Sequence, residues 1–485
     1  MTRFLLALSI GPVQEFIAAA RKTADLYAGS QVLLEVVRAA VTALPAEGLI
    51  FPASAESDGA NKILVVVEGD AAGHAQRAEL AAQAKLLELW AGYIRDIRGD
   101  IDEARATTQL EHFLEVYAAW VPLTDDPQQY AQARRRVEAL LSGRKALRDF
   151  TAFDQGDAGV PKSPLDPAFA SVLKGGRVPR TLQEQYHFKP SEGLDAVSLL
   201  KRMFGRRLRG VPSTQDLAHA GATEEARGRS PFQPRREEAE ETGNVPAYPY
   251  FALLLADGDS MGALLNEPQN NSRHGHRNFS ENLDLFARRA RDIVGQHGGF
   301  SVYTGGDDVL ALLPVTQALA CGQALARAFG EQVTGATLSA GVAVVHYREP
   351  LSASLGYARA AEKKAKAVEG KNAVCVALHT RGGAPLLVAR KWSEAQQIQD
   401  WQETTLPRGL PYELRELARE WPQDFSPQVL SAEAQRRAKR KSDAEGQKLA
   451  DSVIAGMTFQ SGQDLQEFAD MLVLARFLSG KGDRA

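Results

Sequence analysis

Apolar runs and amphipathic stretches alternate along this chain, most clearly between residues 247 and 380. Residues 250 to 256 (YFALLLA) form an uninterrupted apolar run, which is typical of a strand buried on both faces. Helical periodicity and shorter apolar runs follow it in the order of a split βαβ, or ferredoxin-like, domain with one added strand. The predicted helices cover 279–297, 317–329 and 352–368, and the other predicted strands cover 300–304, 309–313, 337–346 and 372–378.

The first hundred residues repeat this order of elements more weakly. A strand is predicted at 4–8, followed by a long helical stretch at 13–43, for which Gly29 is the candidate break. A strand pair at 49–51 and 62–67 and a helix at 71–95 come next. Only the order of elements repeats, because the two regions share no strong similarity in primary sequence.

The remaining segments are mostly helical in character. Periodicity favours helices at 110–123 and 127–141, and the polar stretch 221–246 is interpreted as a linker or a solvated helix. Beyond about residue 385 the chain is predicted to be helical throughout. The sequence thus predicts an α+β protein with ferredoxin-like domains at 1–105 and 247–380, a mostly helical middle region at 106–246 and a helical C-terminal domain at 381–485.

Composition narrows the class of protein. The 485 residues are too many for one ordinary core, and 44% hydrophobic with 24% charged residues is a globular composition. A net charge of −3 excludes a uniformly basic nucleic-acid binder but not a local basic groove. Cys321 and Cys375 lie far apart, so neither a disulfide framework nor a Cys-rich zinc site is expected. No stretch is apolar enough for a membrane span and no signal peptide is convincing, so we expect a cytoplasmic location.

Three carboxylates are predicted to meet at one edge of the second sheet. Asp257 ends the first strand of that domain, and Asp307 and Asp308 lie in the turn that begins the third. The first and third strands of a split βαβ sheet are antiparallel neighbours, so the end of one lies beside the start of the other. Close carboxylates raise one another's pKa, and a divalent cation would keep them ionised.

This arrangement indicates metal-dependent nucleotidyl transfer. Mg²⁺, or Mn²⁺ in its place, binds a few carboxylates together with phosphate oxygens, and a pair of such ions can activate a 3′-hydroxyl and neutralise leaving pyrophosphate. Taken alone, the GGDD sequence is also typical of an ordinary surface turn. The joint placement of the two acidic motifs on neighbouring strands favours the metal site.

Residues beside the carboxylates are candidates for contacting a nucleotide. Gly305 and Gly306 have no side chain to block a triphosphate, and Gly258 permits close approach of the backbone. The backbone amides from Gly258 through Asp259 and Ser260 are candidates for binding phosphate.

Lysines cluster at the end of the last predicted helix of this domain. Among them, Lys366 and Lys371 are candidates for contacting a triphosphate. A solvated helix end, where lysines favour the helix dipole, explains the cluster equally well.

The strings that carry these residues resemble one family. ADGDSMG, YTGGDDVLALLP and AKAVEGKNAV are similar to the second Palm domain of the large subunit of type III CRISPR RNA-targeting complexes. SIGPVQEFIAAARKTADLYAGSQVLLEVV and LIFPASAESDGANKILVVVEG resemble the first Palm domain of the Cmr-type (III-B) version. GLDAVSLLKRMFG and GVPSTQDLA resemble its middle helical domain, so the resemblance runs from residue 4 to about 380.

In that family, paired Palm domains bind ATP and join it 3′–5′ into cyclic oligoadenylates when target RNA pairs with the guide. The resemblance implies ATP as substrate, and other Cmr-type subunits, a guide RNA and a target RNA as partners. It carries the metal ligands over to Asp257, Asp307 and Asp308, and a position near the nucleotide over to Ser30 in AGS. The first Palm domain, which has no acidic turn, is then the non-catalytic, ATP-holding one.

Two departures from the family pattern concern other metal sites. Many members begin with an HD nuclease domain, whereas the first Palm strand is expected at residue 4 here and no histidine is followed by Asp, so no HD nuclease activity is expected. Many members also carry a four-cysteine zinc site. Its counterpart here is GVPKSPLDPAFASVL, with Ser163 where a cysteine would stand, so no zinc is expected.

Other functions fit parts of the sequence. A stand-alone GGDEF-like cyclase acting on GTP would not need the N-terminal Palm domain or the helical tail. A catalytically silent scaffold would not need three converging carboxylates. The basic run at 436–441 suits either RNA phosphates or a solvated helix face, and His274-Gly275-His276 lacks a third metal ligand.

Overall fold

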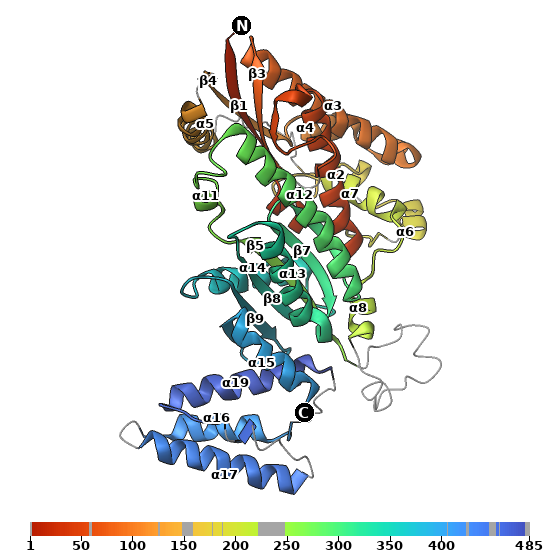
Figure 1. The fold of residues 1–485 in the computed structure, drawn as a ribbon. Coiled ribbons are helices and arrows are strands. Elements are labelled where there is room, and N and C mark those ends of the chain that lie inside the picture. The colour runs from red at the N-terminus through yellow and green to blue at the C-terminus, as the bar shows by residue number, and fades with distance from the viewer. Residues whose placement is uncertain are drawn as a thin grey trace.

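The computed structural model describes residues 2–57, 61–124, 127–147, 159–176, 178–186, 188–221, 248–404, 406–422, 426–445, 453–454 and 456–480. A first sheet domain, a second sheet domain and a helical C-terminal part follow one another along the molecule (Figure 1). Among the described residues, no helix is long and apolar enough to cross a membrane. All but the first residue of the predicted linker at 221–246 lies outside these ranges.

The second domain is built on a six-stranded sheet with the order β10-β9-β8-β5-β7-β6. All neighbouring strands are antiparallel except β8 and β9, which α14 connects in parallel. The order β8-β5-β7-β6 is the predicted split βαβ sheet, and β9 is the predicted added strand. The elements are β5 (Tyr250–Gly258), α11 (Met261–Leu264), α12 (Arg273–Gln296), β6 (Phe300–Gly305), β7 (Asp308–Pro314), η4 (Val315–Gln317), α13 (Ala318–Gln332), β8 (Leu338–His346), α14 (Leu351–Lys366), β9 (Ala373–His379) and β10 (Leu386–Lys391).

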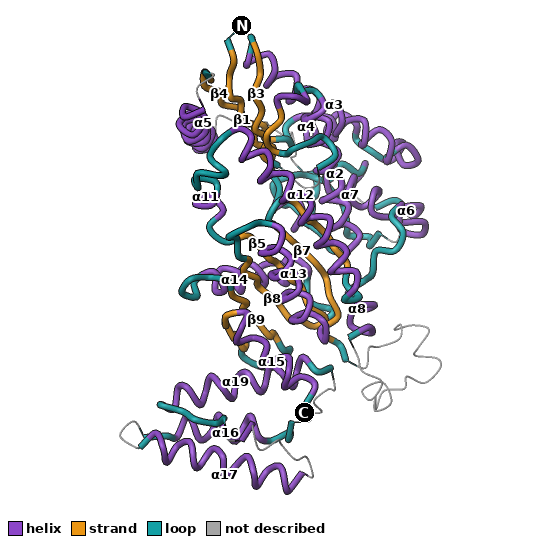
Figure 2. The backbone as a smooth tube through the Cα atoms, in the orientation of Figure 1, coloured by secondary structure: helices purple, strands orange, loops and turns teal. Residues whose placement is uncertain are grey.

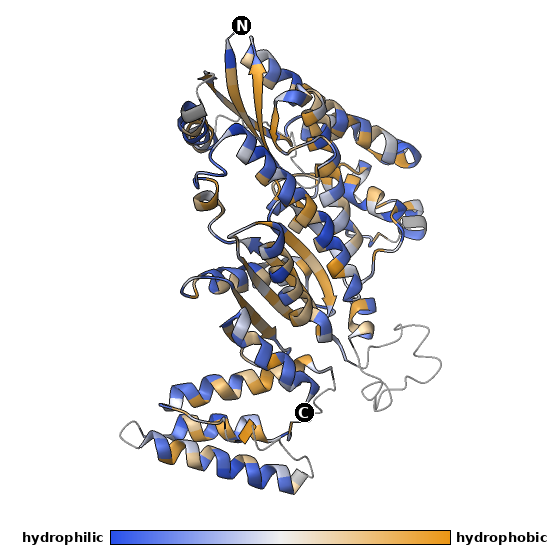
Figure 3. Ribbon diagram, viewed as in Figure 1, coloured by the Kyte–Doolittle hydropathy of each residue, from blue (hydrophilic) through white to orange (hydrophobic). Residues whose placement is uncertain are grey.

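Alternate side chains of the central strand β5 belong to two separate cores. Ala252 and Leu254 pack with α12 and α13, whereas Phe251 and Leu253 pack with α14 and the first domain. All four are fully buried, which explains why this strand is an uninterrupted apolar run. The strands of this sheet are accordingly coloured as hydrophobic, while the surrounding helices alternate between the two colours (Figure 3).

The first domain has an antiparallel four-stranded sheet with the order β2-β3-β1-β4. Strand and helix segments alternate through it as in the second domain (Figure 2). Its elements are β1 (Arg3–Gly11), α1 (Gln14–Ala18), α2 (Thr23–Thr42), η1 (Ala46–Gly48), β2 (Leu49–Phe51), β3 (Lys62–Glu68), α3 (Ala71–Tyr93), η2 (Arg95–Asp100), α4 (Glu103–Glu111), β4 (Glu115–Leu123) and α5 (Pro127–Leu147).

Two local predictions for this domain are wrong. The helical stretch at 13–43 breaks between α1 and α2, not at Gly29, which lies buried inside α2. Residues 115 to 123 form the edge strand β4 instead of a helix, because the edge position gives their backbone groups partners on β1. The sheet therefore extends beyond residue 105, where we predicted the first domain to end.

The middle segment packs its helix α7 (Ala196–Arg207) against α2, burying charged side chains. Arg202 forms an ion pair with Asp25 (Nε to Oδ1, 2.8 Å) and with Glu192 (Nη2 to Oε1, 2.8 Å), and all three side chains are at most 3% exposed. Lys201 donates to the backbone oxygens of Phe16 (2.5 Å) and Ala19 (2.6 Å) at the end of α1. The shorter elements are η3 (Lys174–Gly176), α6 (Arg180–Tyr186) and α8 (Thr214–Ala220).

Among the described residues of the C-terminal part, the regular elements are helices except for the first one. Strand β10 pairs with β9, which contradicts the prediction of helix throughout beyond 385, because the open edge of β9 offers it hydrogen bonds. The basic run of 436–441 lies on α17, where Arg436 and Arg437 pair with Glu433 while Arg440 and Lys441 pair with Glu413. The helices are α15 (Trp392–Glu403), α16 (Leu410–Glu420), α17 (Pro427–Glu445) and α19 (Gly462–Leu478).

The buried ion pairs of Arg202 lead to a stability prediction. Replacing Asp25 with Ala leaves the buried guanidinium of Arg202 with one carboxylate partner fewer. We therefore expect the free energy of unfolding to fall by about 3 kcal/mol, measured as a lower midpoint in urea unfolding. Glu79→Ala, an exposed change on α3, is the control and should shift stability by no more than about 0.5 kcal/mol. Equal midpoints for the two variants would contradict the prediction.

Candidate functional site

The pairing of β5 with β7 brings the predicted carboxylates to one edge of the second sheet. Ala256 lies opposite Val309 in the antiparallel register, so Asp257 and Asp308 come at the next position of each strand. Leu310, two residues after Asp308, belongs to the core shared with the first domain. Because side chains alternate along a strand, Asp308 projects to that same face.

The turn that carries Asp307 depends on glycine at two positions. A Cβ at Gly258 would lie 2.9 Å from Asp307 Cβ and 2.7 Å from Met261 Sδ, so only glycine admits the close approach of Asp307 to the end of β5. Gly306 has a φ of 62°, in the left-handed region, and faces Phe51 of the first domain. Gly305 pairs with Asp308 at the base of the turn. The predicted glycines therefore shape the backbone that holds the acids.

A cavity of about 300 Å³ lies where this edge of the sheet meets the first domain. Asp257 and Asp308 line it from the sheet, and Arg359 and Glu362 line it from α14. Arg359 Nη2 donates to the backbone oxygen of Gln14 (3.2 Å) and so connects α14 to α1. The first domain contributes Val13, Gln14, Ile17 and Asn61 to the lining.

The sequence analysis missed Arg359 and Glu362. Together with Lys366 they recur at spacings of three and four residues, which places them on one face of α14. That spacing was visible in the sequence. What the sequence did not contain was the direction of this face, because it points to a cavity that only the docking of two domains creates.

Burial controls the protonation of the acidic pair in the turn. Burial first, and then the charges of Asp307 and Glu362, raise the pKa of Asp308 to about 7. Burial also raises the pKa of Asp307. In the folded protein, the ionised forms of Asp307 and Asp308 are therefore destabilised unless a cation lies close to them.

Lys366 supplies one such cation. Its ammonium pairs with Asp257 Oδ2 and also lies 3.2 Å from Glu362 Oε1. Burial, and next the charge of Lys371, lower the pKa of Lys366. Within the described ranges, no three His, Cys, Asp or Glu side chains are already arranged as a metal-binding group.

Lys371 and Ser260 form a second contact beside the carboxylates. Lys371 Nζ donates to Ser260 Oγ (2.9 Å), and both residues have positive φ, 50° and 56°. The structure therefore unites two residues that were predicted separately as nucleotide contacts, one from the β5–α11 connection and one from the α14–β9 connection.

Asp259 has a different place from the one predicted. Its backbone amide donates to Thr337 O (2.8 Å) and is therefore not free to bind phosphate. Its side chain is 3% exposed, and Oδ2 accepts from Thr337 Oγ1 (2.8 Å), Ser339 Oγ (3.0 Å) and the amide of Asn372 (3.0 Å). Oδ1 has no hydrogen-bond partner among the described residues. Asp259 thus braces the loops beneath the site instead of lining its surface.

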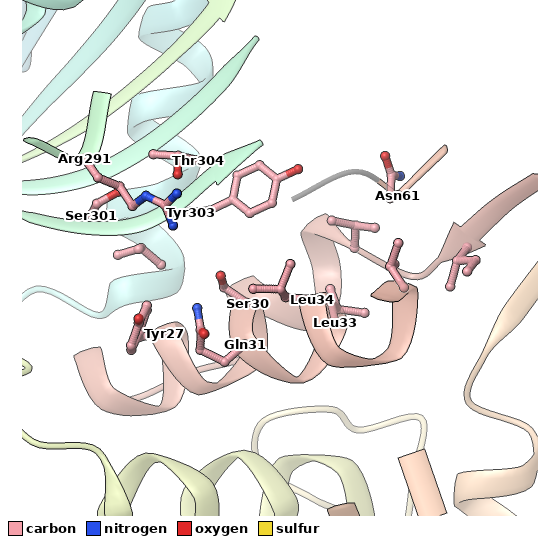
Figure 4. Close-up of a pocket in the computed structure, with 14 residues that line it drawn as sticks. Tyr27, Ser30, Gln31, Leu33, Leu34, Asn61, Arg291, Ser301, Tyr303 and Thr304 are labelled. Atoms are coloured by element: carbon pink, nitrogen blue, oxygen red, sulfur yellow. The ribbon is translucent and has the colours of Figure 1, made fainter. Parts of the chain in front are cut away.

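Ser30 lies on α2 and faces the second domain across a smaller neighbouring cavity. Figure 4 shows Ser30 and Gln31 below β6, from which Tyr303 projects into the space between the domains. Burial, and then the charges of Asp308 and Asp307, raise the pKa of the Tyr303 hydroxyl. Asn61 and Tyr303, together with Val13, line both cavities, so Ser30 and the carboxylates belong to one continuous region.

Two other sequence features have structural roles. His276 is buried and hydrogen-bonded to Tyr130 (Nδ1 to the hydroxyl, 2.9 Å), and burial lowers its pKa to about 4. Ser163 is buried and donates to Asp195 Oδ2 (2.6 Å).

The fold and the site together define a paired-palm protein, in which two ferredoxin-like domains face each other across a cavity lined by carboxylates. Residues 250–375 match the second palm domain of Cas10/Cmr2, and residues 5–109 match the N-terminal region of the CRISPR-associated protein Cmr2. Both sheet domains thus match Cas10/Cmr2 models, and the N-terminal one matches a model of the Cmr2 type.

Individual relatives agree with this assignment. The CRISPR system Cmr subunit Cmr2 of Pyrococcus furiosus is 31% identical in an alignment of length 182, which covers 31% of this chain and 21% of that protein. The type III-B Cmr-beta structure in its apo state superimposes with a TM-score of 0.69, at 12% identity, over 99% of this chain and 82% of that one. The Csm1–Csm4 cassette in complex with cA4 gives a TM-score of 0.55, at 15% identity, over 98% and 70%. At these identities the two structures show a shared fold.

The raised pKa of Asp308 predicts a pH-dependent stability. Between the ordinary carboxyl pKa and about 7, the folded chain binds a proton at Asp308 that the unfolded chain does not, so stability falls as pH rises through this window. Asp308→Asn should remove this loss of stability, because an amide in the same place does not become charged as the pH rises. We expect its melting temperature in EDTA to exceed that of the unmodified chain by about 2 °C or more near pH 8.5, with a smaller difference near pH 5.5.

Differential scanning fluorimetry at the two pH values tests this expectation. Asp292→Asn, an exposed change on α12, is the matched control and should have no pH-dependent effect. The same shift for Asp308→Asn at both pH values would contradict the assigned pKa.

Proposed function

We propose that this chain joins ATP 3′–5′ into cyclic oligoadenylates, as the catalytic subunit of a guide-RNA-directed type III-B CRISPR antiviral complex. The observation that carries the proposal is the cavity between two palm domains that Asp257 and Asp308 line, with Asp307 packed beside them. The matches to Cas10/Cmr2 domain models support it, and the Csm1–Csm4 cassette, which shares the fold, has been solved in complex with cA4, pppApApA and AMPPNP.

Mg²⁺, or Mn²⁺ in its place, is the proposed cofactor, with Asp257, Asp307 and Asp308 as its protein ligands. The donor set fits these hard cations, which prefer carboxylate oxygens, and the raised pKa of Asp308 marks a position where added positive charge would be stabilising. When bound, the metal activates a 3′-hydroxyl and neutralises the leaving pyrophosphate. No zinc is part of the proposal.

Side chains around the acids have complementary roles in binding ATP. Lys366 and the contact between Lys371 and Ser260 lie beside the acids, where cationic and hydroxyl donors suit a triphosphate. Arg359 adds a further cation from α14. Tyr303 offers an aromatic surface to an adenine between the domains.

The first palm domain is proposed to hold a second ATP. Its counterpart of the acidic turn contains no carboxylate pair, whereas Ser30 and Gln31 face the shared cavity with polar groups. An ATP bound there would lie beside the carboxylates of the second domain and so be positioned to react with its neighbour.

The proposed partners are other Cmr-type subunits, a guide RNA and a target RNA. The type III-B Cmr-beta assembly has been solved bound to cognate target RNA, and its matching chain shares the fold at a TM-score of 0.67 over 99% of this chain. We propose that pairing of target RNA with the guide activates the site.

Mass spectrometry of ATP reaction products tests the proposed function. The assembled complex with ATP, Mg²⁺ and matching target RNA is expected to give cyclic oligoadenylates, and replacing Asp307 and Asp308 with Ala should lower the yield by at least about a hundredfold. Glu369→Gln, an exposed change beyond α14, is the control and should leave the yield unchanged.

Each alternative predicts a different outcome. A stand-alone cyclase would make cyclic dinucleotides from GTP without RNA or partner subunits. A silent scaffold would give no product and would assemble normally after the Asp→Ala changes. An oligoadenylate yield that survives both replacements would place the chemistry in another chain.

A further inference from the structure

Helix α14 presents a charged face to the carboxylate cavity. Arg359 and Glu362 line the cavity, and Lys366, one turn beyond Glu362, pairs with Asp257 at the end of β5. The side chains of Lys366 and Glu362 are 26% and 18% exposed, so their interaction is partly shielded from water. Lys366 is thus shared between a carboxylate of the sheet and a carboxylate of its own helix.

This sharing creates a conflict at Asp257. The proposed function requires the Asp257 carboxylate to bind a divalent cation, while the structure has an ammonium in contact with Oδ2 of that carboxylate. Two cations at one carboxylate oxygen repel each other strongly in a partly buried site. Metal binding and the Lys366–Asp257 ion pair are therefore in competition.

Glu362 provides a second partner for Lys366 without any backbone movement. Its Oε1 lies 3.2 Å from Lys366 Nζ, and the two residues are four apart on the same helix, a spacing at which Glu and Lys side chains meet. Among the described residues, Lys366 is the one cation paired with Glu362. The lysine can consequently leave Asp257 and stay within the cavity.

We propose that Glu362 is a positioning residue that draws Lys366 off Asp257 when a divalent cation enters the site. The inference rests on the proposed function, because it takes Asp257 to be a metal ligand. In the metal-bound state Lys366 pairs with Glu362 and keeps its ammonium beside the position proposed for the triphosphate. Without Glu362, Asp257 is the one carboxylate paired with Lys366 among the described residues, and the lysine competes with the metal for it.

Binding of Mn²⁺ to the full chain without nucleotide tests this inference, with free Mn²⁺ measured by electron paramagnetic resonance. Lys366→Ala removes the competitor, so Mn²⁺ is expected to bind about fivefold more tightly. Glu362→Gln should weaken binding about fivefold in the unmodified chain. In the Lys366→Ala background the same change should alter it by less than about twofold, because the lysine it acts through is gone.

Lys363→Ala and Glu369→Gln are matched controls, as both side chains are exposed and lie at or just beyond the same helix end. Lys366→Met, which keeps the aliphatic stem, should reproduce Lys366→Ala and guards against an effect of lost packing, and thermal melts check that every variant is folded. If Glu362→Gln weakens Mn²⁺ binding equally in the unmodified chain and in the Lys366→Ala variant, the inference is overturned, since Glu362 would then act on the metal directly. Weaker Mn²⁺ binding by Lys366→Ala would also overturn it.

Asp257→Asn separates this inference from the function on which it rests. If Asp257→Asn weakens Mn²⁺ binding but Glu362 and Lys366 show no coupling, only the inference fails. If Asp257→Asn leaves Mn²⁺ binding unchanged, the metal site of the proposed function fails, and the inference with it.

Discussion

The antiparallel pairing of β5 with β7 is the constraint on which the site depends. In the observed register Ala256 lies opposite Val309, so the acids that follow and precede these residues leave the sheet at the same edge. A slip of one residue would turn Asp308 to the opposite face, toward α12 and α13. The apolar alternation fixes the register, because Leu310 and Leu312 must enter one core while Val309 and Ala311 enter the other.

The cavity exists because two domains of the same plan meet at this edge. The first domain contributes α1 and Asn61, which directly precedes β3, and α14 of the second domain closes the opposite wall. Arg359 spans the gap to Gln14, while Lys201 holds the end of α1 from the middle segment. The position of the first-domain wall thus depends on a buried lysine far away in the sequence.

The site retains features that oppose stability. Two acids in the turn have raised pKa values because burial disfavours their charge, and Oδ1 of Asp259 is buried without a hydrogen-bond partner in the described part of the chain. Ser260, Lys371 and Asn372 adopt positive φ beside it. Strain and uncompensated charge gathered at one edge are typical of a functional site, where binding supplies the compensation.

The sequence by itself determined the second domain and its acids. Strong alternation and long apolar runs define each strand locally, and the order of elements then requires Asp257 to lie beside Asp307 and Asp308. Prediction from the sequence failed where contacts with adjacent strands decide the secondary structure. Residues 115–123 and 386–391 form strands because open sheet edges offer hydrogen bonds to their backbone. The hydrophobic pattern of a segment does not indicate whether such an edge lies beside it. Only the tertiary structure decided that Glu362 and Arg359 line the cavity, that Asp259 is buried beneath it, and that Lys366 contacts Asp257. The physical reason is that each of these facts concerns the space between elements, and that space is set by how the two domains and α14 pack together.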